Sequence, residues 1–433
     1  MRCKEQHVID SSGGGKSTFS VRRVRRSPFN YFKSPDFPIH LMCYWWLMWL
    51  AISCTDLNQF TTPSTATMAQ YLLLIASFYI GHLLVKIYRP FNAMQSKHFY
   101  RPLHSDSARV KGAIRISVIG CTLMLLVSLK LSGAFDANFI DYFALVRVGL
   151  ANDSTSTVTG IHTLDILTKI LAFPLSYMMI VTILGAEIKA FKILLVVSVI
   201  NLICFSYLWQ VNYPFIHCFW LLIFYILLIG QRRNAFNKKI IISLAVLFVV
   251  LLASAANRVG GDILGGFQRY IFGYHLLGFS YYDYQYSDPT SILHSHTFGR
   301  SSLGFLDQAL EQFLKSIGST YRSASLENAG FNETNVDLGA TDVLEFNAFG
   351  TILFGLYRDF NVIGIALGGL VYGVVVTLAR YKSAQSWISG ALFLLLAAAW
   401  MMGMMVDPIE EAYFWWVIVA LYMFGVFNRG LKW

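Results

Sequence analysis

The chain contains ten apolar runs, each close to the length that crosses a lipid bilayer as a helix. A helix spans the hydrocarbon layer with about 20 mostly apolar residues. Only 13% of the residues are charged and the mean hydropathy is +0.53, whereas soluble domains carry about 25% charged residues. We therefore predict an all-α polytopic membrane protein with about ten transmembrane helices. The runs lie at 39–55, 67–86, 113–133, 164–186, 191–209, 213–230, 240–256, 360–379, 388–406 and 412–428.

The distribution of basic residues predicts the orientation of these spans. If the N-terminus is cytoplasmic, 25 of the 34 Lys and Arg residues fall in cytoplasmic segments, as the positive-inside rule requires. We therefore expect both termini in the cytoplasm of a bacterial cell and the spans in its inner (cytoplasmic) membrane. The net charge of +10 then reflects topology and contact with membrane lipids, and we expect no nucleic-acid partner.

The same pattern predicts four regions along the chain. Residues 1–38 form a basic cytoplasmic segment that does not read as a cleavable signal peptide. Residues 39–256 form seven spans with a smaller periplasmic loop at 134–163. A large periplasmic loop with short helical elements follows at 257–359, and three further spans occupy 360–433. A connection as long as this loop usually carries function.

Arginine is unexpected in the large loop, because basic residues are under-represented on the outer side of a membrane. Its planar guanidinium matches phosphate oxygens in paired hydrogen bonds, so these residues favour an anionic ligand. Arg258 and Arg269 flank a glycine-rich stretch at the depth of lipid headgroups, although Arg258 could simply reach to the interface. Arg300 lies further along the loop.

The segment 347–379 is too long for one span, since 33 helical residues at about 1.5 Å each overshoot a bilayer. We predict a separate short element before Phe360, which places Arg358 and Asp359 at the mouth of the eighth span. Charges at this depth are functional by default, and the alternative is a helix cap. His296 could act as a general base or be a solvated loop residue, and the histidines have no spacing that suits zinc, so we expect no metal.

Two stretches resemble a known family. The pattern Asn347, Phe349, Tyr357, Asp359, Phe360, Gly364, Gly373 resembles the C-terminal signature of the Wzy-type O-antigen polymerases (oligosaccharide repeat-unit polymerases). The stretch from Arg269 to Phe279 resembles the arginine- and tyrosine-bearing start of their large periplasmic loop. Elsewhere the resemblance rests on topology, and Asn361 departs from the glycine that usually follows Asp-Phe in the family.

The resemblance implies a metal-independent membrane glycosyltransferase of lipopolysaccharide or related polysaccharide biosynthesis, with no cofactor. Such an enzyme moves a growing glycan from its undecaprenyl-pyrophosphate carrier onto a lipid-linked repeat unit at the periplasmic face. A polysaccharide chain-length regulator is a further partner that the resemblance allows. Arginines would neutralise the pyrophosphate, and a carboxylate or histidine would take the acceptor proton. The assignments are Arg258, Arg269, Arg300 and Arg358 for pyrophosphate, Asp359, Glu345 and His296 for the base, and Tyr270, Tyr274, Asn347 and Tyr357 for the glycan.

Three alternatives stay open. An O-antigen ligase has the same architecture and donor, although the stretch Asn347–Gly364 favours a polymerase. A flippase or other transporter would carry charges near the middle of its spans and often internal repeats, neither of which is evident in the sequence. A structural membrane scaffold would not need the arginines of the large loop.

Overall fold

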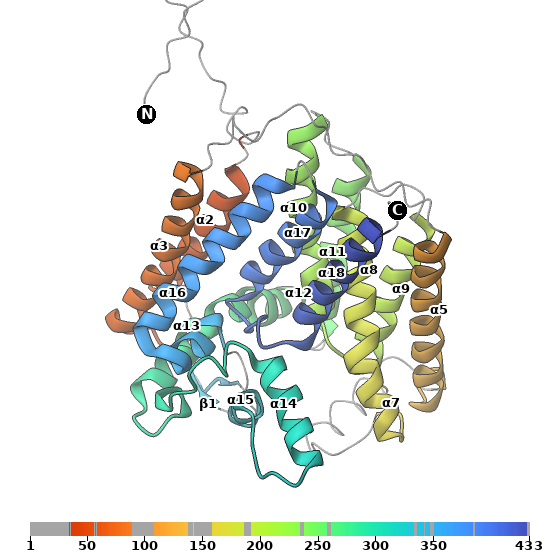
Figure 1. The fold of residues 1–433 in the computed structure, drawn as a ribbon. Coiled ribbons are helices and arrows are strands. Elements are labelled where there is room, and N and C mark those ends of the chain that lie inside the picture. The colour runs from red at the N-terminus through yellow and green to blue at the C-terminus, as the bar shows by residue number, and fades with distance from the viewer. Residues whose placement is uncertain are drawn as a thin grey trace, which may run out of the picture.

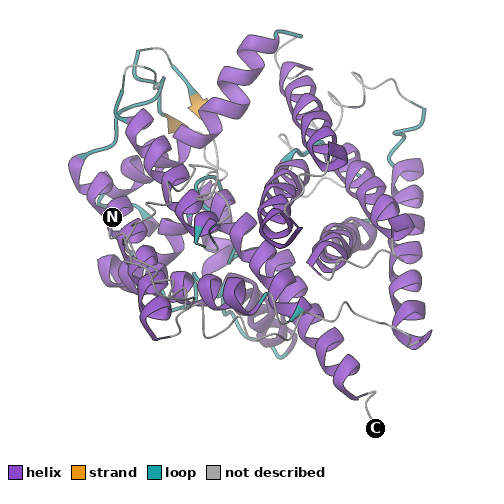
Figure 2. Cartoon of the chain, turned by 90° about the horizontal axis from the view of Figure 1, so that it is seen from above, coloured by secondary structure: helices purple, strands orange, loops and turns teal. Residues whose placement is uncertain are grey.

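The computed structural model describes residues 34, 36–55, 57, 59–88, 108–136, 142, 158–185, 192–233, 238–257, 261–332, 336–341, 343–346, 350–383 and 386–430. These residues are overwhelmingly helical (Figures 1 and 2). The first half contains α2 (Phe37–Ser53), α3 (Thr65–Tyr88), α5 (Ala108–Leu131), α7 (His162–Leu167), the π-helix η1 (Thr168–Ala172), α8 (Phe173–Gly185), α9 (Lys192–Trp209) and α10 (Tyr213–Arg233). The second half contains α11 (Lys238–Asn257), α12 (Ile263–Gly266), the π-helix η3 (Phe267–Phe272), α13 (Gly273–Ser287), the 3-10 helix η4 (Ile292–His294), α14 (Gly304–Ser316), α15 (Ala324–Asn332), β1 (Val336–Asp337), β2 (Glu345–Phe346), α16 (Ile352–Lys382), α17 (Trp387–Met402) and α18 (Ala412–Gly430).

Each of the ten apolar runs coincides with a helix. Four of the described helical stretches are long and apolar enough to cross a membrane, namely Thr65–Tyr88, His162–Gly185, Lys192–Trp209 and Ile352–Lys382. Shorter apolar helices lie in the other runs, including Phe37–Ser53 and Trp387–Met402. The fold is therefore that of an all-α, membrane-embedded protein, while the number of ten spans and their topology stay predictions.

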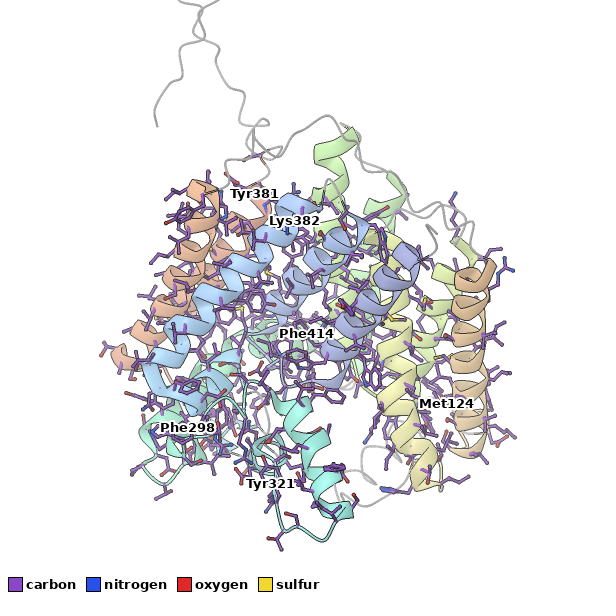
Figure 3. All side chains as sticks on the ribbon, in the orientation of Figure 1. Met124, Phe298, Tyr321, Tyr381, Lys382 and Phe414 are labelled. Carbon is purple, nitrogen blue, oxygen red and sulfur yellow. The ribbon has the colours of Figure 1, made fainter. Side chains whose placement is uncertain are left out.

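The bundle has two distinct ends, which Figure 3 marks with labelled side chains. At the proximal end, Asp36 before α2 accepts hydrogen bonds from Lys86 Nζ at 2.5 Å and from Tyr381 Oη at 3.1 Å. Tyr381 lies at this end, whereas Phe298 and Tyr321 lie at the opposite, distal end (Figure 3). We use distal end for the region of α14, α15, β1 and β2 (Figure 1).

Close packing of α3 against α16 forms one side of the bundle. A Cβ atom added at Gly369 would lie 2.6 Å from the carbonyl oxygen of Leu74, and one at Gly373 would collide with the carbonyl of Phe78. Small residues allow membrane helices to approach until their backbones touch, which gains van der Waals contact where lipid provides no hydrophobic drive. These glycines therefore fix the position of α16 against α3.

Helix α16 is broken near its start, at Phe360 and Asn361. Phe360 has φ −145° and ψ 31°, and Asn361 has φ 54° and ψ −145°, both outside the helical region. Asparagine tolerates positive φ better than most residues, and a Cβ at Gly364 would collide with the carbonyl of Leu356 across the break. The predicted separate element before Phe360 is therefore present, as the buried turns from Ile352 to Asp359.

The segment predicted as a large loop is tied closely to the bundle. Helix α13 buries ten of its 15 residues, and Tyr282 Oη donates to Gln70 Oε1 of α3 at 2.5 Å. A Cβ at Gly278 would collide with the carbonyl of Met404, in the turn between α17 and α18. The two-residue strands pair antiparallel and place Val336 opposite Phe346. The distal end is therefore a packed structure that can hold side chains in fixed positions.

Candidate functional site

Arg358 is the centre of a buried polar network at the distal end. Its side chain is 1% exposed, and its five N–H donors match five acceptors. Nε and Nη2 donate to the carbonyl and hydroxyl oxygens of Ser295 at 3.3 and 2.8 Å, and Nη2 also reaches Glu327 Oε2 at 3.0 Å. Nη1 donates to the carbonyl of Ala324 at 3.4 Å and to Oδ1 of Asn328. Arg358 therefore joins α15 and the 295–302 turn to α16, and no donor remains for a substrate phosphate.

The neighbouring Asp359 fixes the same turn. Its carboxylate is 2% exposed and accepts from Thr297 Oγ1 at 2.6 Å. It also accepts from the backbone N–H groups of Ser301 and Ser302 at 3.0 and 2.8 Å. A carboxylate with three donors and little access to solvent is suited to holding a turn. The geometry favours this role over that of the predicted general base.

Glu410, in the turn between α17 and α18, brings an ionisable group to the network. Its Oε1 accepts hydrogen bonds from Asn328 Nδ2 and, at 3.3 Å, from Ser301 Oγ. Burial raises the pKa of Glu410 to about 8, and Glu411 adds to this increase, although the two donors and the charge of Arg358 oppose it. A carboxyl group with a pKa near neutrality can exchange a proton under physiological conditions.

A second buried acid, Asp407, lies in the same turn. It is 6% exposed, and burial together with the charge of Glu410 raises its pKa well above the ordinary value. A Cβ at Gly355 would lie 2.5 Å from Asp407 Oδ2, so the absence of a side chain at Gly355 lets this carboxyl group approach α16. Like charges that share a low-dielectric site disfavour ionisation of both, so this pair holds at least one proton near pH 7.

Arg300 places a cation at the edge of the network. Its side chain is 39% exposed, and Nε lies 3.3 Å from Asp307 Oδ1. Nη2 donates to the carbonyl oxygen of Arg322 at 2.6 Å, and the guanidinium lies over the ring of Tyr321 at 4.8 Å from its centroid. The partly exposed guanidinium can still meet an anion. Arg300 is adjacent in sequence to Ser301, a hydrogen-bond partner of Glu410, so a cation and a proton acceptor converge here.

Arg269 belongs to a different part of the distal surface. Its guanidinium lies 5.5 Å from the ring centroid of Phe346 and 5.9 Å from that of Tyr270. The helical stretch 263–287 separates it from Tyr286, whose ring contacts that of Tyr357 at 5.6 Å. Seventeen residues at a rise of about 1.5 Å place Arg269 roughly 25 Å from that contact. Arg269 and Arg358 therefore cannot hold the same pyrophosphate.

The other predicted residues divide between these two groups. His296 is exposed, and its Nε2 lies 3.3 Å from Asn361 Nδ2 at the break in α16, so it stays an accessible candidate base. Tyr357 is 8% exposed in an aromatic cluster, which leaves little surface for a sugar. Tyr274 contacts Tyr270 at 5.5 Å. Exposed Glu345 lies in β2, next to Phe346.

Two predicted residues, Arg258 and Asn347, lie outside the described residues. Within the described part of the chain, no group of three or more His, Cys, Asp or Glu side chains is arranged to hold a metal ion.

Sequence reasoning missed Glu410, Asn328 and Ser301. The available signal was the run Asp407-Pro-Ile-Glu410-Glu411, which places three acids in five residues between two apolar runs. Nothing in the sequence indicated that α15 and the 295–302 turn would meet this run.

No family model, curated protein or solved structure matches this chain.

Proposed function

We propose that this protein is a membrane glycosyltransferase that polymerises undecaprenyl-pyrophosphate-linked oligosaccharide repeat units into O-antigen or a related surface polysaccharide. In this proposal the ten spans have both termini in the cytoplasm, and the distal end faces the periplasm. The observation that carries it is the juxtaposition of Glu410, a carboxyl group that titrates near neutral pH, with the partly exposed guanidinium of Arg300. Transfer from a lipid pyrophosphate requires this pair of functions.

Each residue has a defined part in the proposed reaction. The terminal hydroxyl oxygen of the acceptor repeat unit attacks the anomeric carbon of the donor glycan and forms the new glycosidic bond. The bond from that carbon to the pyrophosphate oxygen breaks, and the pyrophosphate leaves with the electron pair. Ionised Glu410 takes the acceptor proton, and Arg300 neutralises the charge that develops on the leaving group. Arg358 and Asp359 position the turn that carries Arg300.

The O-antigen ligase is the nearest competing function, because it uses the same donor and differs only in its acceptor. A flippase needs neither a proton acceptor nor a leaving-group cation at one end of the bundle. Glycan profiling by gel of a strain that lacks this protein separates the three. A core with a single repeat unit is the result expected of a lost polymerase. A core without any repeat would refute the proposal in favour of ligation or flipping, and an unchanged ladder would refute all three.

Complementation then tests the site. We expect wild-type protein to restore the ladder and Glu410→Gln to leave single repeats at equal protein abundance. His296→Ala provides the matched comparison, since His296 is the accessible rival base. A ladder from Glu410→Gln together with its loss in His296→Ala would transfer the role of base to His296.

A further inference from the structure

Helix α14 carries an apolar stripe that faces away from the protein. Leucine, phenylalanine and isoleucine side chains recur at intervals of three and four residues, which places them on one face of a helix. Each is between 43% and 67% exposed, and the set is Leu303, Leu306, Leu310, Phe313 and Ile317. In a water-soluble domain such a face would be turned inward.

The polar face of α14 is buried in its place. Asp307 accepts hydrogen bonds from Tyr321 Oη and, at 2.7 Å, from the backbone N–H of Ala324. Glu311 is fully buried and accepts from the backbone N–H of Ser323 at 2.8 Å. Rotating α14 to bury its stripe would expose these acceptors and leave the first N–H groups of α15 without partners, which is costly. The outward direction of the stripe is therefore fixed by the structure.

The stripe continues an apolar surface that begins on a predicted span. Trp416, Val419 and Tyr422 lie on one face of α18 and are 37%, 50% and 69% exposed. The ring of Phe305, in the first turn of α14, lies 6.1 Å from that of Trp416. Figure 1 shows α14 at about the level of the lower ends of α5 and α7. This helix therefore starts where the apolar surface of the bundle ends.

The charge of α14 also fits a membrane surface. Both acids of the helix are inside, so the charged side chain it exposes is Lys315, which is 50% exposed and pairs with Glu311 at 2.5 Å. Arg322, beyond the end of the helix, is exposed as well. Basic side chains beside an apolar face are typical of helices that lie in the headgroup region of a bilayer.

We propose that α14 lies in the bilayer interface with its stripe among the acyl chains of membrane phospholipids. The helix then holds Arg300 and the buried network at headgroup depth. This inference requires a membrane-embedded chain and does not depend on the glycosyltransferase reaction.

Photocrosslinking of the full-length protein in vesicles of phosphatidylethanolamine and phosphatidylglycerol tests the inference. A benzophenone amino acid is introduced at position 310 or 313 on the stripe, and at 312 as the matched control. Gln312 is exposed on the same helix but lies off the stripe. All three positions are exposed, so the substitutions should leave the fold intact. Mass spectrometry of the irradiated peptides identifies what each position touched.

We expect phospholipid adducts at positions 310 and 313 at least tenfold more abundant than at 312. Equal adducts at all three positions would overturn the inference, because α14 would then have no preferred face toward lipid. Crosslinked dimers in vesicles, or adducts with another protein or a polyprenyl lipid in cells, would overturn it in favour of that occupant. The absence of any stripe-specific adduct would place the stripe in water and overturn it as well.

Discussion

Replacing Glu410 with glutamine separates the proposed chemistry from a purely structural role. The glutamine side chain keeps the size and one carbonyl acceptor for Asn328 and Ser301, so the network stays connected while the proton-accepting group is lost. Loss of a general base slows a reaction by about 10²- to 10⁴-fold. The variant should therefore lose at least about 100-fold in the rate of glycan transfer.

The pH dependence of the wild-type reaction gives a second, independent magnitude. With a pKa of about 8, Glu410 is mostly protonated at pH 7 and mostly ionised at pH 9. The active ionised fraction rises from about one tenth to about nine tenths across that range, so we expect roughly a ninefold increase in rate. Reconstituted protein and purified lipid-linked repeat units provide the assay, with initial rates followed between pH 6 and 9.

Stability should change with pH in the opposite direction. The pKa of Glu410 in the folded protein lies above the 4.5 of an ordinary glutamate, so the folded state binds the proton more tightly than the unfolded state. This contribution is fully present below pH 4.5 and is lost as the pH rises through about 8. The Glu410→Gln variant lacks this contribution, so its melting temperature should decline less than that of the wild type between pH 6 and 9. A flat rate profile together with an active Glu410→Gln variant would refute the reasoning.

Three further changes test the architecture around the site. Asp359→Ala leaves two buried backbone N–H groups without an acceptor and should cost about 3 kcal/mol, measured as thermal unfolding in detergent, whereas an unchanged melting temperature would restore a catalytic role for Asp359. Gly373→Leu should force α3 from α16 and cost about 3 kcal/mol in the same assay, whereas Gly120→Ala, with nothing within 4 Å of the added Cβ, should be neutral. Arg300→Ala should reduce glycan transfer about 100-fold with partial recovery in Arg300→Lys, whereas Lys130→Ala, from an exposed pair, should transfer glycan normally.

The helical character of the chain was predictable because the bilayer imposes one simple requirement. Backbone groups in lipid must be satisfied within the segment, so a long apolar run has few alternatives to a helix. The break in α16 was predictable for a related reason, since the apolar length before Thr377 exceeds one span and the charges of Arg358 and Asp359 interrupt it. Length and charge are local properties, and the sequence displays them directly.

The partners of Arg358 could not be read in the same way. The sequence placed it among the residues that bind pyrophosphate, because an arginine near a membrane surface suggests an anion. Its five hydrogen bonds depend on Ser295, Ala324, Glu327 and Asn328 arriving from two other segments. An arginine that is fully satisfied inside the protein and one that awaits a ligand have the same sequence signature. Only the number of acceptors around the guanidinium distinguishes them.

The amphipathic pattern of α14 poses the same ambiguity at the level of a whole helix. Periodicity shows that Leu306, Leu310 and Phe313 share a face, but it does not say whether that face meets the protein core or lipid. The carboxylates decide the question. Because Asp307 and Glu311 accept hydrogen bonds from the first N–H groups of α15 and its preceding residue, they must point inward, and the leucines must then point outward. In a membrane protein the location of satisfied buried acids therefore predicts the lipid-facing side of a surface helix better than its hydrophobic pattern does.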